Sequence, residues 1–186
     1  MRLTIYDKAP GDRLTDHALA FWWWVGCVIQ KLFGQVDDYY GAETWADAKA
    51  WLDSKPGPFM SVQYWGHGSQ GTVWLAGKPV GWDQWLLLKS KMLPTSLLWF
   101  RICSSFGGRM GQQMSQVLAD GLNCIVAGHT RIIGFIQGGL HTRKPNTPPS
   151  WAESEQELTE TWLTDAGLQW GNNSIFRFQT KIPDGW

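Results

Sequence analysis

A histidine and a cysteine, which together can carry out nucleophilic catalysis, each follow an apolar, strand-like run in this 186-residue sequence. His67 comes just after residues 59–65 (FMSVQYW), and Cys103 comes directly after residues 96–102 (SLLWFRI). A thiol is a good nucleophile only as the thiolate, which a neighbouring imidazole favours. We therefore interpret Cys103 and His67 as a catalytic dyad.

The small residues beside the dyad suit an acyl-transfer site. Gly68 follows His67 and allows the backbone to come close to a substrate. The backbone N–H groups of Gly68 and Cys103 are candidate donors to a developing oxyanion. Ser104 and Ser105 keep the turn after the cysteine small and open. We predict Gly68 and Cys103 as the oxyanion site.

The other cysteines have simpler interpretations. Cys27 lies in an apolar helical run and Cys124 in a strand-like run, so both are predicted to be small buried hydrophobic residues. Three sparse cysteines without a CxxC motif predict neither a disulfide framework nor a metal site. No cofactor is expected. His17 and His141 are predicted at the surface.

The elements that must position these residues alternate along the chain. Strands are predicted at residues 3–6, 35–39, 59–65, 96–102 and 124–127, helices at 17–33, 44–54, 82–91 and 109–122, and a hairpin at 72–80. Such alternation predicts an α/β fold with a mostly parallel sheet and helices on both faces. The turns at 66–68, 103–105 and 128–130 would then gather at the carboxyl edge of the sheet, where ligands bind in such folds.

The chain is predicted to form one domain over residues 1–186, with residues 142–186 as a C-terminal extension. In this extension a Pro-rich loop at 142–149 is followed by an acidic helix at 151–164, which Ser150 would cap, and by a strand at 174–182.

Composition narrows the class of protein. Hydrophobic residues make up 44% and charged residues 17%, which is typical of a globular protein, and 16 basic residues balance 16 acidic ones. No basic face for nucleic acid is expected. The most hydrophobic run, residues 18–29, is too short to cross a bilayer, so we predict no membrane span and a cytoplasmic location, with export lacking a cleaved signal left open. Most of the fourteen Trp are predicted to be core residues.

Two short motifs carry a resemblance to a known family. YWGHGSQG at residues 64–71, followed by FRICSSFGG at 100–108, resembles the caspase-like cysteine peptidases of clan CD, which include caspases, gingipains, legumains, separases and CHAT proteases. The resemblance implies a caspase-like α/β fold with flavodoxin-like topology over about residues 3–133. It also implies a cysteine endopeptidase acting on a protein or peptide substrate through an acyl-enzyme. Cys103 would be the nucleophile, His67 the general acid–base and Gly68 an oxyanion donor.

The resemblance also implies a substrate pocket at three strand ends, with Asp7, Arg101 and His129 as its residues. Asp7 would orient His67 or accept a basic substrate side chain, whereas Arg101 would favour an acidic one, and the sequence does not choose between them. The caspase signature QACRG is replaced here by RICSS at residues 101–105, so a preference for Asp is not implied.

Two other functions stay open. One is an inactive caspase-like scaffold that binds a regulatory or oligomeric partner through a Trp-rich surface. The other is a cysteine amidohydrolase or acyltransferase that acts on small substrates.

Overall fold

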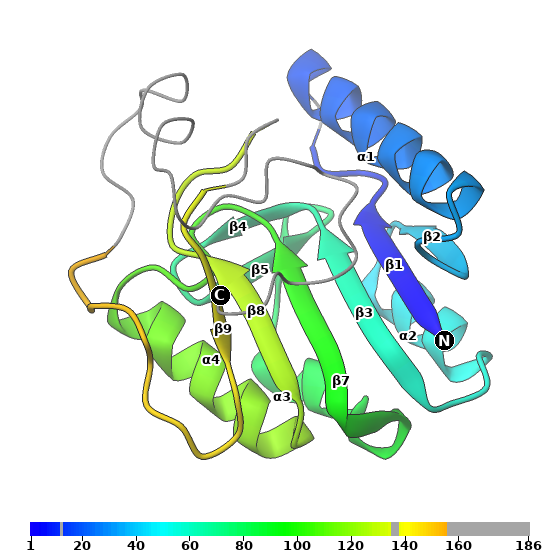
Figure 1. The fold of residues 1–186 in the computed structure, drawn as a ribbon. Coiled ribbons are helices and arrows are strands. Elements are labelled where there is room, and N and C mark those ends of the chain that lie inside the picture. The colour runs from blue at the N-terminus through cyan, green and yellow to red at the C-terminus, as the bar shows by residue number, and fades with distance from the viewer. Residues whose placement is uncertain (12, 135–137, 156–186) are drawn as a thin grey trace.

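A computed structural model describes residues 1–11, 13–134 and 138–155 of the chain. Its centre is a six-stranded sheet in the order β2-β1-β3-β7-β8-β9 (Figure 1). The strands are β1 (Arg2–Asp7), β2 (Asp38–Ala42), β3 (Phe59–Trp65), β7 (Met92–Arg101), β8 (Ile125–His129) and β9 (Leu140–Arg143). The first five are parallel, and β9 pairs antiparallel with β8. The mostly parallel α/β sheet predicted from the sequence is confirmed.

The order of the parallel strands is that of a flavodoxin-like sheet, in which the second strand lies at the edge beside the first. The chain leaves β1 toward β2 on one side and returns to β3 on the other side. The carboxyl ends of β1 and β3 therefore flank the point where the winding direction reverses, which is the usual ligand crevice of such sheets.

Helices cover both faces of the sheet, as predicted. The faces carry separate cores, and the larger core joins α2 (Trp45–Asp53), α3 (Trp82–Leu86) and α4 (Gly108–Leu122) to one face. On the opposite face α1 (Leu14–Leu32) packs over β1 and β2 (Figure 1). Its Trp23 and Cys27 meet Tyr6 of β1 and Trp65 at the end of β3. A Cβ at Gly26 would lie 2.5 Å from the Trp65 ring, so only a glycine lets the helix approach the sheet this closely.

A small antiparallel sheet follows β3 directly. It consists of β4 (His67–Ser69), β5 (Thr72–Leu75) and β6 (Lys78–Val80). The hairpin predicted at 72–80 is confirmed, and its turn residues Ala76 and Gly77 both have positive φ, 51° and 70°. The Asp7 carboxylate ties this hairpin to the end of β1, because its Oδ2 accepts the Ala76 N–H at 3.0 Å.

Several predicted boundaries change. Residues 35–39 were expected to form the second strand, which instead runs from Asp38 to Ala42, and the helix expected at 82–91 divides into α3 and a 3₁₀ turn at Lys89–Lys91. Gly128 and His129 belong to strand β8 and not to a turn. Strands β4 and β9 were not predicted. The predicted strand at 174–182 lies outside the described residues.

The helix predicted at 151–164 is wrong for residues 151–155, and the rest of it lies outside the described residues. Trp151 stacks on Phe106 and His141, and its indole N–H donates to the Phe106 carbonyl at 2.9 Å. Glu155 accepts from Thr130 at 2.8 Å and lies 2.7 Å from His141 Nε2. Together with the hydrogen bond that Gln112 Nε2 of α4 donates to the Trp151 carbonyl at 2.9 Å, these contacts hold the segment in an irregular path. They also correct the prediction for His141, which is buried and not at the surface.

Among the described residues, no helix is both long and apolar enough to cross a membrane.

Candidate active site

The two predicted catalytic residues line one pocket. His67 begins β4 two residues beyond the carboxyl end of β3, and Cys103 lies two residues beyond the end of the neighbouring strand β7. The pocket has a volume of about 90 Å³, enough for a few waters or a small group of atoms. Its lining residues are Leu19, Trp23, Trp65, Gly66, His67, Arg101, Cys103, Ile133 and Gly134. The structure thus brings His67, Arg101 and Cys103 together.

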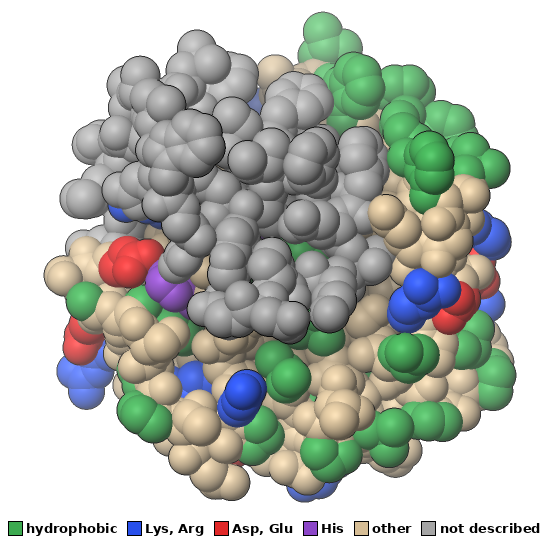
Figure 2. Space-filling view, in the orientation of Figure 1, with side chains coloured by type: hydrophobic (Ala, Val, Ile, Leu, Met, Phe, Trp, Pro, Cys, Tyr) green, Lys and Arg blue, Asp and Glu red, His purple; other side chains and the backbone are tan. Residues whose placement is uncertain are grey.

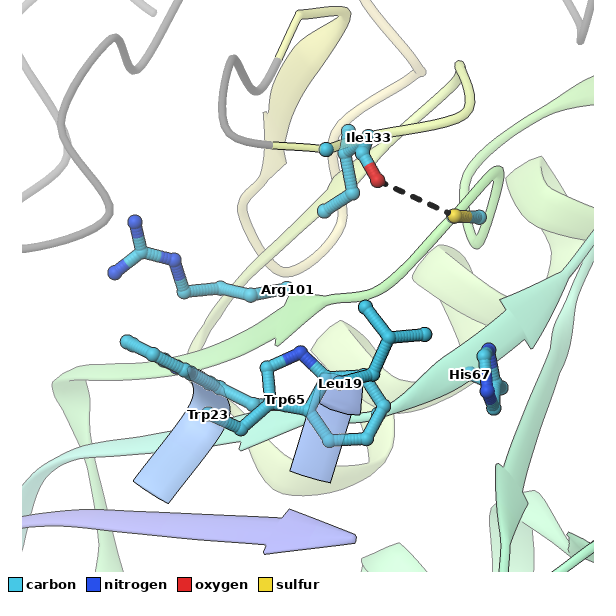
Figure 3. A pocket seen from close by; sticks show the side chains of 9 residues that line it. Leu19, Trp23, Trp65, His67, Arg101 and Ile133 are labelled. Carbon is cyan, nitrogen blue, oxygen red and sulfur yellow. Dashed lines mark hydrogen bonds between the residues drawn. The ribbon is translucent and has the colours of Figure 1, made fainter. Parts of the chain in front are cut away.

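Helix α1 and the ends of strands β3 and β7 contribute side chains to the walls of the pocket (Figure 3). Leu19 and Trp23 belong to α1, and Trp65 ends β3. The Trp23 ring meets the His67 ring edge to face, with centroids 5.5 Å apart. This contact fixes one side of the imidazole against an apolar wall.

The Cys103 thiol lies beside Ile133 in the lining of the pocket. It donates a hydrogen bond to the Ile133 carbonyl at 3.7 Å, the dashed line in Figure 3. Cys103 is partly exposed, whereas Cys27 and Cys124 are completely buried as predicted. Cys103 is therefore the most exposed of the three cysteines.

The turn that carries Cys103 is held from two directions by backbone hydrogen bonds. Ser104 N–H donates to Arg131 O at 2.8 Å and Phe106 N–H donates to His129 O at 2.9 Å, both beyond or at the end of β8. Ser105 O accepts from Gly71 N–H of the β4–β5 turn at 3.1 Å. Ser104 has a positive φ of 48°, an uncommon conformation for a residue other than glycine.

Gly68 lies against the same turn. A Cβ at Gly68 would come within 3.0 Å of the Cys103 carbonyl oxygen and would collide with the Ile102 side chain. Only glycine allows this approach of β4 to the end of β7, which keeps the residue after His67 close to the cysteine backbone. The structure therefore places Gly68 against the Cys103 carbonyl, and the role of the two N–H groups as oxyanion donors stays a prediction.

A carboxylate that the sequence did not point out lies beside His67. Asp16, in the first turn of α1, places Oδ1 3.8 Å from His67 Nε2. Its other oxygen accepts the Arg13 N–H at 3.2 Å. A Cβ at Gly11 would collide with this carboxylate, so the glycine leaves the space that Asp16 occupies. In sequence Asp16 resembles any acidic residue at a helix start, and its contact with His67 depends on how α1 packs.

Asp7 has a different environment from the one expected. It is completely buried, and its two oxygens accept N–H groups from Ala9 at 3.1 Å and from Ala76 at 3.0 Å. Burial raises the pKa of the Asp7 carboxyl, while those two hydrogen bonds and the nearby His67 oppose the rise. Both oxygens are used to join the end of β1 to the β5–β6 turn, and Asp7 is not among the described residues that line the pocket.

Arg101 contributes its side chain to one wall of the pocket. Its guanidinium lies 4.3 Å from the Trp99 ring centre and 4.9 Å from the Trp65 ring centre. Nη1 donates to Gln63 Oε1 at 3.2 Å. Figure 3 shows this guanidinium on the side of the pocket away from His67. The cation is therefore stacked between two indoles and is almost completely buried.

His129 is a structural residue in this fold. It is completely buried, and Nδ1 donates to the Gly138 carbonyl at 3.0 Å, whereas no hydrogen bond to Nε2 is found among the described residues. Burial lowers the pKa of His129 to about 3, so the ring is neutral at ordinary pH. It is absent from the described lining of the pocket. His129 supports the turn after Cys103 through its backbone carbonyl, which accepts the Phe106 N–H.

The described residues contain no group of three or more His, Cys, Asp or Glu residues that could hold a metal ion. No known protein-family model matches the sequence, and neither a curated protein nor a solved structure matches it.

Proposed function

We propose that this protein is a cysteine endopeptidase of the caspase-like type, with Cys103 as nucleophile and His67 as general acid–base. The observation that carries the proposal is that both side chains line one pocket at the carboxyl edge of a flavodoxin-like sheet. A partly exposed thiol and an imidazole that line the same pocket are the groups that cysteine-dependent acyl transfer needs. The caspase-like type is proposed because the strand that precedes the His-Gly motif, β3, comes before the strand that precedes the cysteine, β7, in the chain and pairs with it in the sheet.

In the proposed reaction His67 takes the proton of the Cys103 thiol, which in the resting arrangement points to Ile133 O. The sulfur attacks the carbonyl carbon of the scissile peptide, and a carbon–sulfur bond forms as the carbonyl becomes an oxyanion. The N–H groups of Gly68 and Cys103 are the proposed donors to this oxyanion. His67 then gives its proton to the departing amine, and water hydrolyses the resulting thioester.

Asp16 is the proposed positioning residue for His67. At 3.8 Å its carboxylate is within ion-pair distance but outside hydrogen-bond distance of Nε2. Attraction to Asp16 and the edge contact with Trp23 restrict the imidazole from two sides. With Nε2 directed to Asp16, Nδ1 is the nitrogen proposed to exchange the proton with sulfur and amine.

The test is cleavage of a peptide library by the full chain, with products identified by mass spectrometry. Cys103→Ala and His67→Ala should each lower the rate of cleavage by at least ~10²-fold, since one general acid–base alone contributes that much. Cys124→Ala and His17→Ala serve as matched controls and should keep the wild-type rate. A Cys103→Ala protein that cleaves at the wild-type rate would disprove the assignment.

The size of the pocket favours a second candidate, a cysteine amidohydrolase acting on a small substrate. A pocket of about 90 Å³ accepts only a few atoms. The two candidates share the dyad and differ in the leaving group. Formation of an acyl-enzyme from small amides or esters, together with no cleavage anywhere in the peptide library, would favour this second candidate.

A further inference from the structure

The solvent-facing side of α1 carries large apolar side chains from its first turn to the residue after its last turn. Six large hydrophobic side chains on or directly after the helix are 43–86% exposed: Leu14, Phe21, Trp22, Trp24, Leu32 and Phe33. Figure 2 shows hydrophobic side chains gathered over the part of the surface where Figure 1 places α1. Contiguous exposed apolar surface of this kind marks an interaction site in a soluble protein. We name this set the α1 surface.

The spacing of the exposed apolar residues along α1 indicates which kind of element would pack on them. Residues 14, 18, 21, 25, 28 and 32 are Leu, Ala, Phe, Val, Val and Leu, separated alternately by four and three positions. Every one of them is exposed or partly exposed, whereas Trp23, Gly26, Cys27 and Gln30 face the sheet. An alternation of four and three is the repeat of a helix that packs along another helix. The outer side of α1 along these six positions, of which Leu14, Phe21 and Leu32 belong to the α1 surface, is therefore shaped for a helix.

We propose that the second helix is α1 of another copy of this chain, packed antiparallel in a two-fold dimer. In this arrangement Leu14 faces the partner's Leu32, Ala18 faces the partner's Val28, and Phe21 faces the partner's Val25. The same pairs recur on both sides of the axis, as a two-fold interface requires. Antiparallel pairing also sets the positive end of each helix dipole beside the negative end of the other.

The exposed area agrees with a dimer of ordinary size. At ~150–250 Å² for a full aromatic side chain and the exposures given above, the α1 surface offers roughly 700 Å² per copy. A stable interface buries about 800 Å² per partner. The chain also carries 16 acidic and 16 basic residues, so net charge does not keep two copies apart.

This dimer is independent of the proposed peptidase chemistry. Leu19 and Trp23 line the pocket from the sheet-facing flank of the helix, whereas the proposed seam lies on the outer side. The pocket residues are therefore left uncovered by the pairing. The oligomeric state can be measured without any substrate.

The first experiment is analytical ultracentrifugation of the full chain between about 1 and 100 µM. We expect a mass of twice 21.1 kDa at the upper end of this range. Phe21→Asp and, separately, Leu32→Glu should each return the mass to that of one chain and weaken association by at least tenfold. Leu87→Asp is the matched control, because Leu87 is 57% exposed at the end of α3, away from α1, and should leave the dimer intact.

The circular dichroism spectrum and thermal midpoint of each variant show whether it is folded. Two variants are used because Leu32 is 79% exposed and tolerates a charge even if Phe21 does not. A wild-type protein that is monomeric at every concentration overturns the proposal. So does a dimer that survives both substitutions, because it must then use another surface. Binding of the monomer to lipid vesicles without any dimer would also overturn it in favour of a membrane surface.

The second experiment tests the direction of the helices in a Cys103→Ala background. Ala18→Cys together with Val28→Cys should form a disulfide-linked dimer on mild oxidation. Ala18→Cys alone should not, because antiparallel helices place the two copies of residue 18 about 15 Å apart along the axis. Efficient crosslinking by Ala18→Cys alone would show a parallel pair and refute the arrangement proposed.

Discussion

The selectivity of thiol labelling is a direct prediction from the three cysteine environments. Burial raises the pKa of the Cys27 thiol and raises the pKa of Cys124 to about 12. At pH 7.5 a thiol with a pKa near 12 is ionised in only about 3 × 10⁻⁵ of the molecules, compared with roughly a tenth for an ordinary thiol. Ionisation alone therefore makes Cys124 about 10³-fold slower than an ordinary thiol, and complete burial slows it further.

The assay is reaction with iodoacetamide at pH 7.5, followed by peptide mapping at increasing times. We expect one modified residue, Cys103, labelled at least ~10³-fold faster than Cys27 or Cys124 in the folded protein. In 6 M guanidinium chloride all three cysteines should react at similar rates. The unfolded sample is thus an internal control for the reagent and the mapping.

The same assay tests the dyad. His67→Ala should slow labelling of Cys103 by about tenfold, because the imidazole no longer accepts the thiol proton. His17→Ala is the control, since His17 is exposed on the outer part of α1. Equal rates for all three cysteines in the folded protein would refute the interpretation of burial and favour a scaffold. An unchanged Cys103 rate in His67→Ala would refute the dyad while leaving the burial argument intact.

Three further substitutions probe the site and its support. Asp16→Asn should lower the rate of Cys103 labelling and of catalysis about fivefold, since attraction across 3.8 Å between the carboxylate and the imidazolium formed when His67 takes the thiol proton is worth ~1 kcal/mol at a partly exposed site. Asp47→Asn at the equivalent turn of α2 should change neither rate, and an equal loss in both variants would indicate only an effect at the start of a helix. Gly68→Ala should destabilise the fold by roughly 1–3 kcal/mol in chemical denaturation and slow the labelling of Cys103, because the added methyl group meets Ile102 and the Cys103 carbonyl oxygen. Gly57→Ala should be tolerated, because the nearest atom to its added methyl group lies 3.5 Å away. In the wild type the native pKa of His129, about 3, lies below the unfolded value near 6.5. His129 therefore contributes stability above pH 6.5 that is lost as the pH falls toward 3, by up to ~4 kcal/mol. His129→Asn should remove this contribution, so the free energy of unfolding should fall less steeply with decreasing pH in the variant. Denaturant titrations at pH 7, 5 and 4 measure it, and parallel curves for the variant and wild type would contradict it.

The parts of the fold that the sequence predicts are those with a local physical signal. The run at residues 59–65 is apolar and bounded by Pro58 and Gly66, and it is β3 with the predicted ends. The turn at Ala76-Gly77 contains a residue suited to positive φ and forms the predicted hairpin. Asn123 ends α4 in the left-handed conformation at φ 53°, which asparagine tolerates well.

The missed features depend on contacts between distant segments. Strand β4 is only three residues long and exists because His67–Ser69 pairs with Thr72–Trp74. Strand β9 forms because it pairs antiparallel with β8. The contact of Asp16 with His67 requires α1 to rest on Trp65 through Gly26, and no spacing within residues 13–33 reveals this.

The backbone around Cys103 adopts a conformation that costs free energy. Ser104 is held at φ 48°, a conformation that costs a residue with a side chain roughly 1–2 kcal/mol. On the other side, Gly68 can be nothing larger without displacing Ile102 or the Cys103 carbonyl. A turn whose only role was to join β7 to α4 could relax both features by a small shift of the chain. The backbone hydrogen bonds that Ser104 and Phe106 donate and that the Ser105 carbonyl accepts oppose that shift and hold the turn beside the pocket. Strain retained at such a position is typical of functional sites, and it favours a reactive role for Cys103 over a role in packing alone.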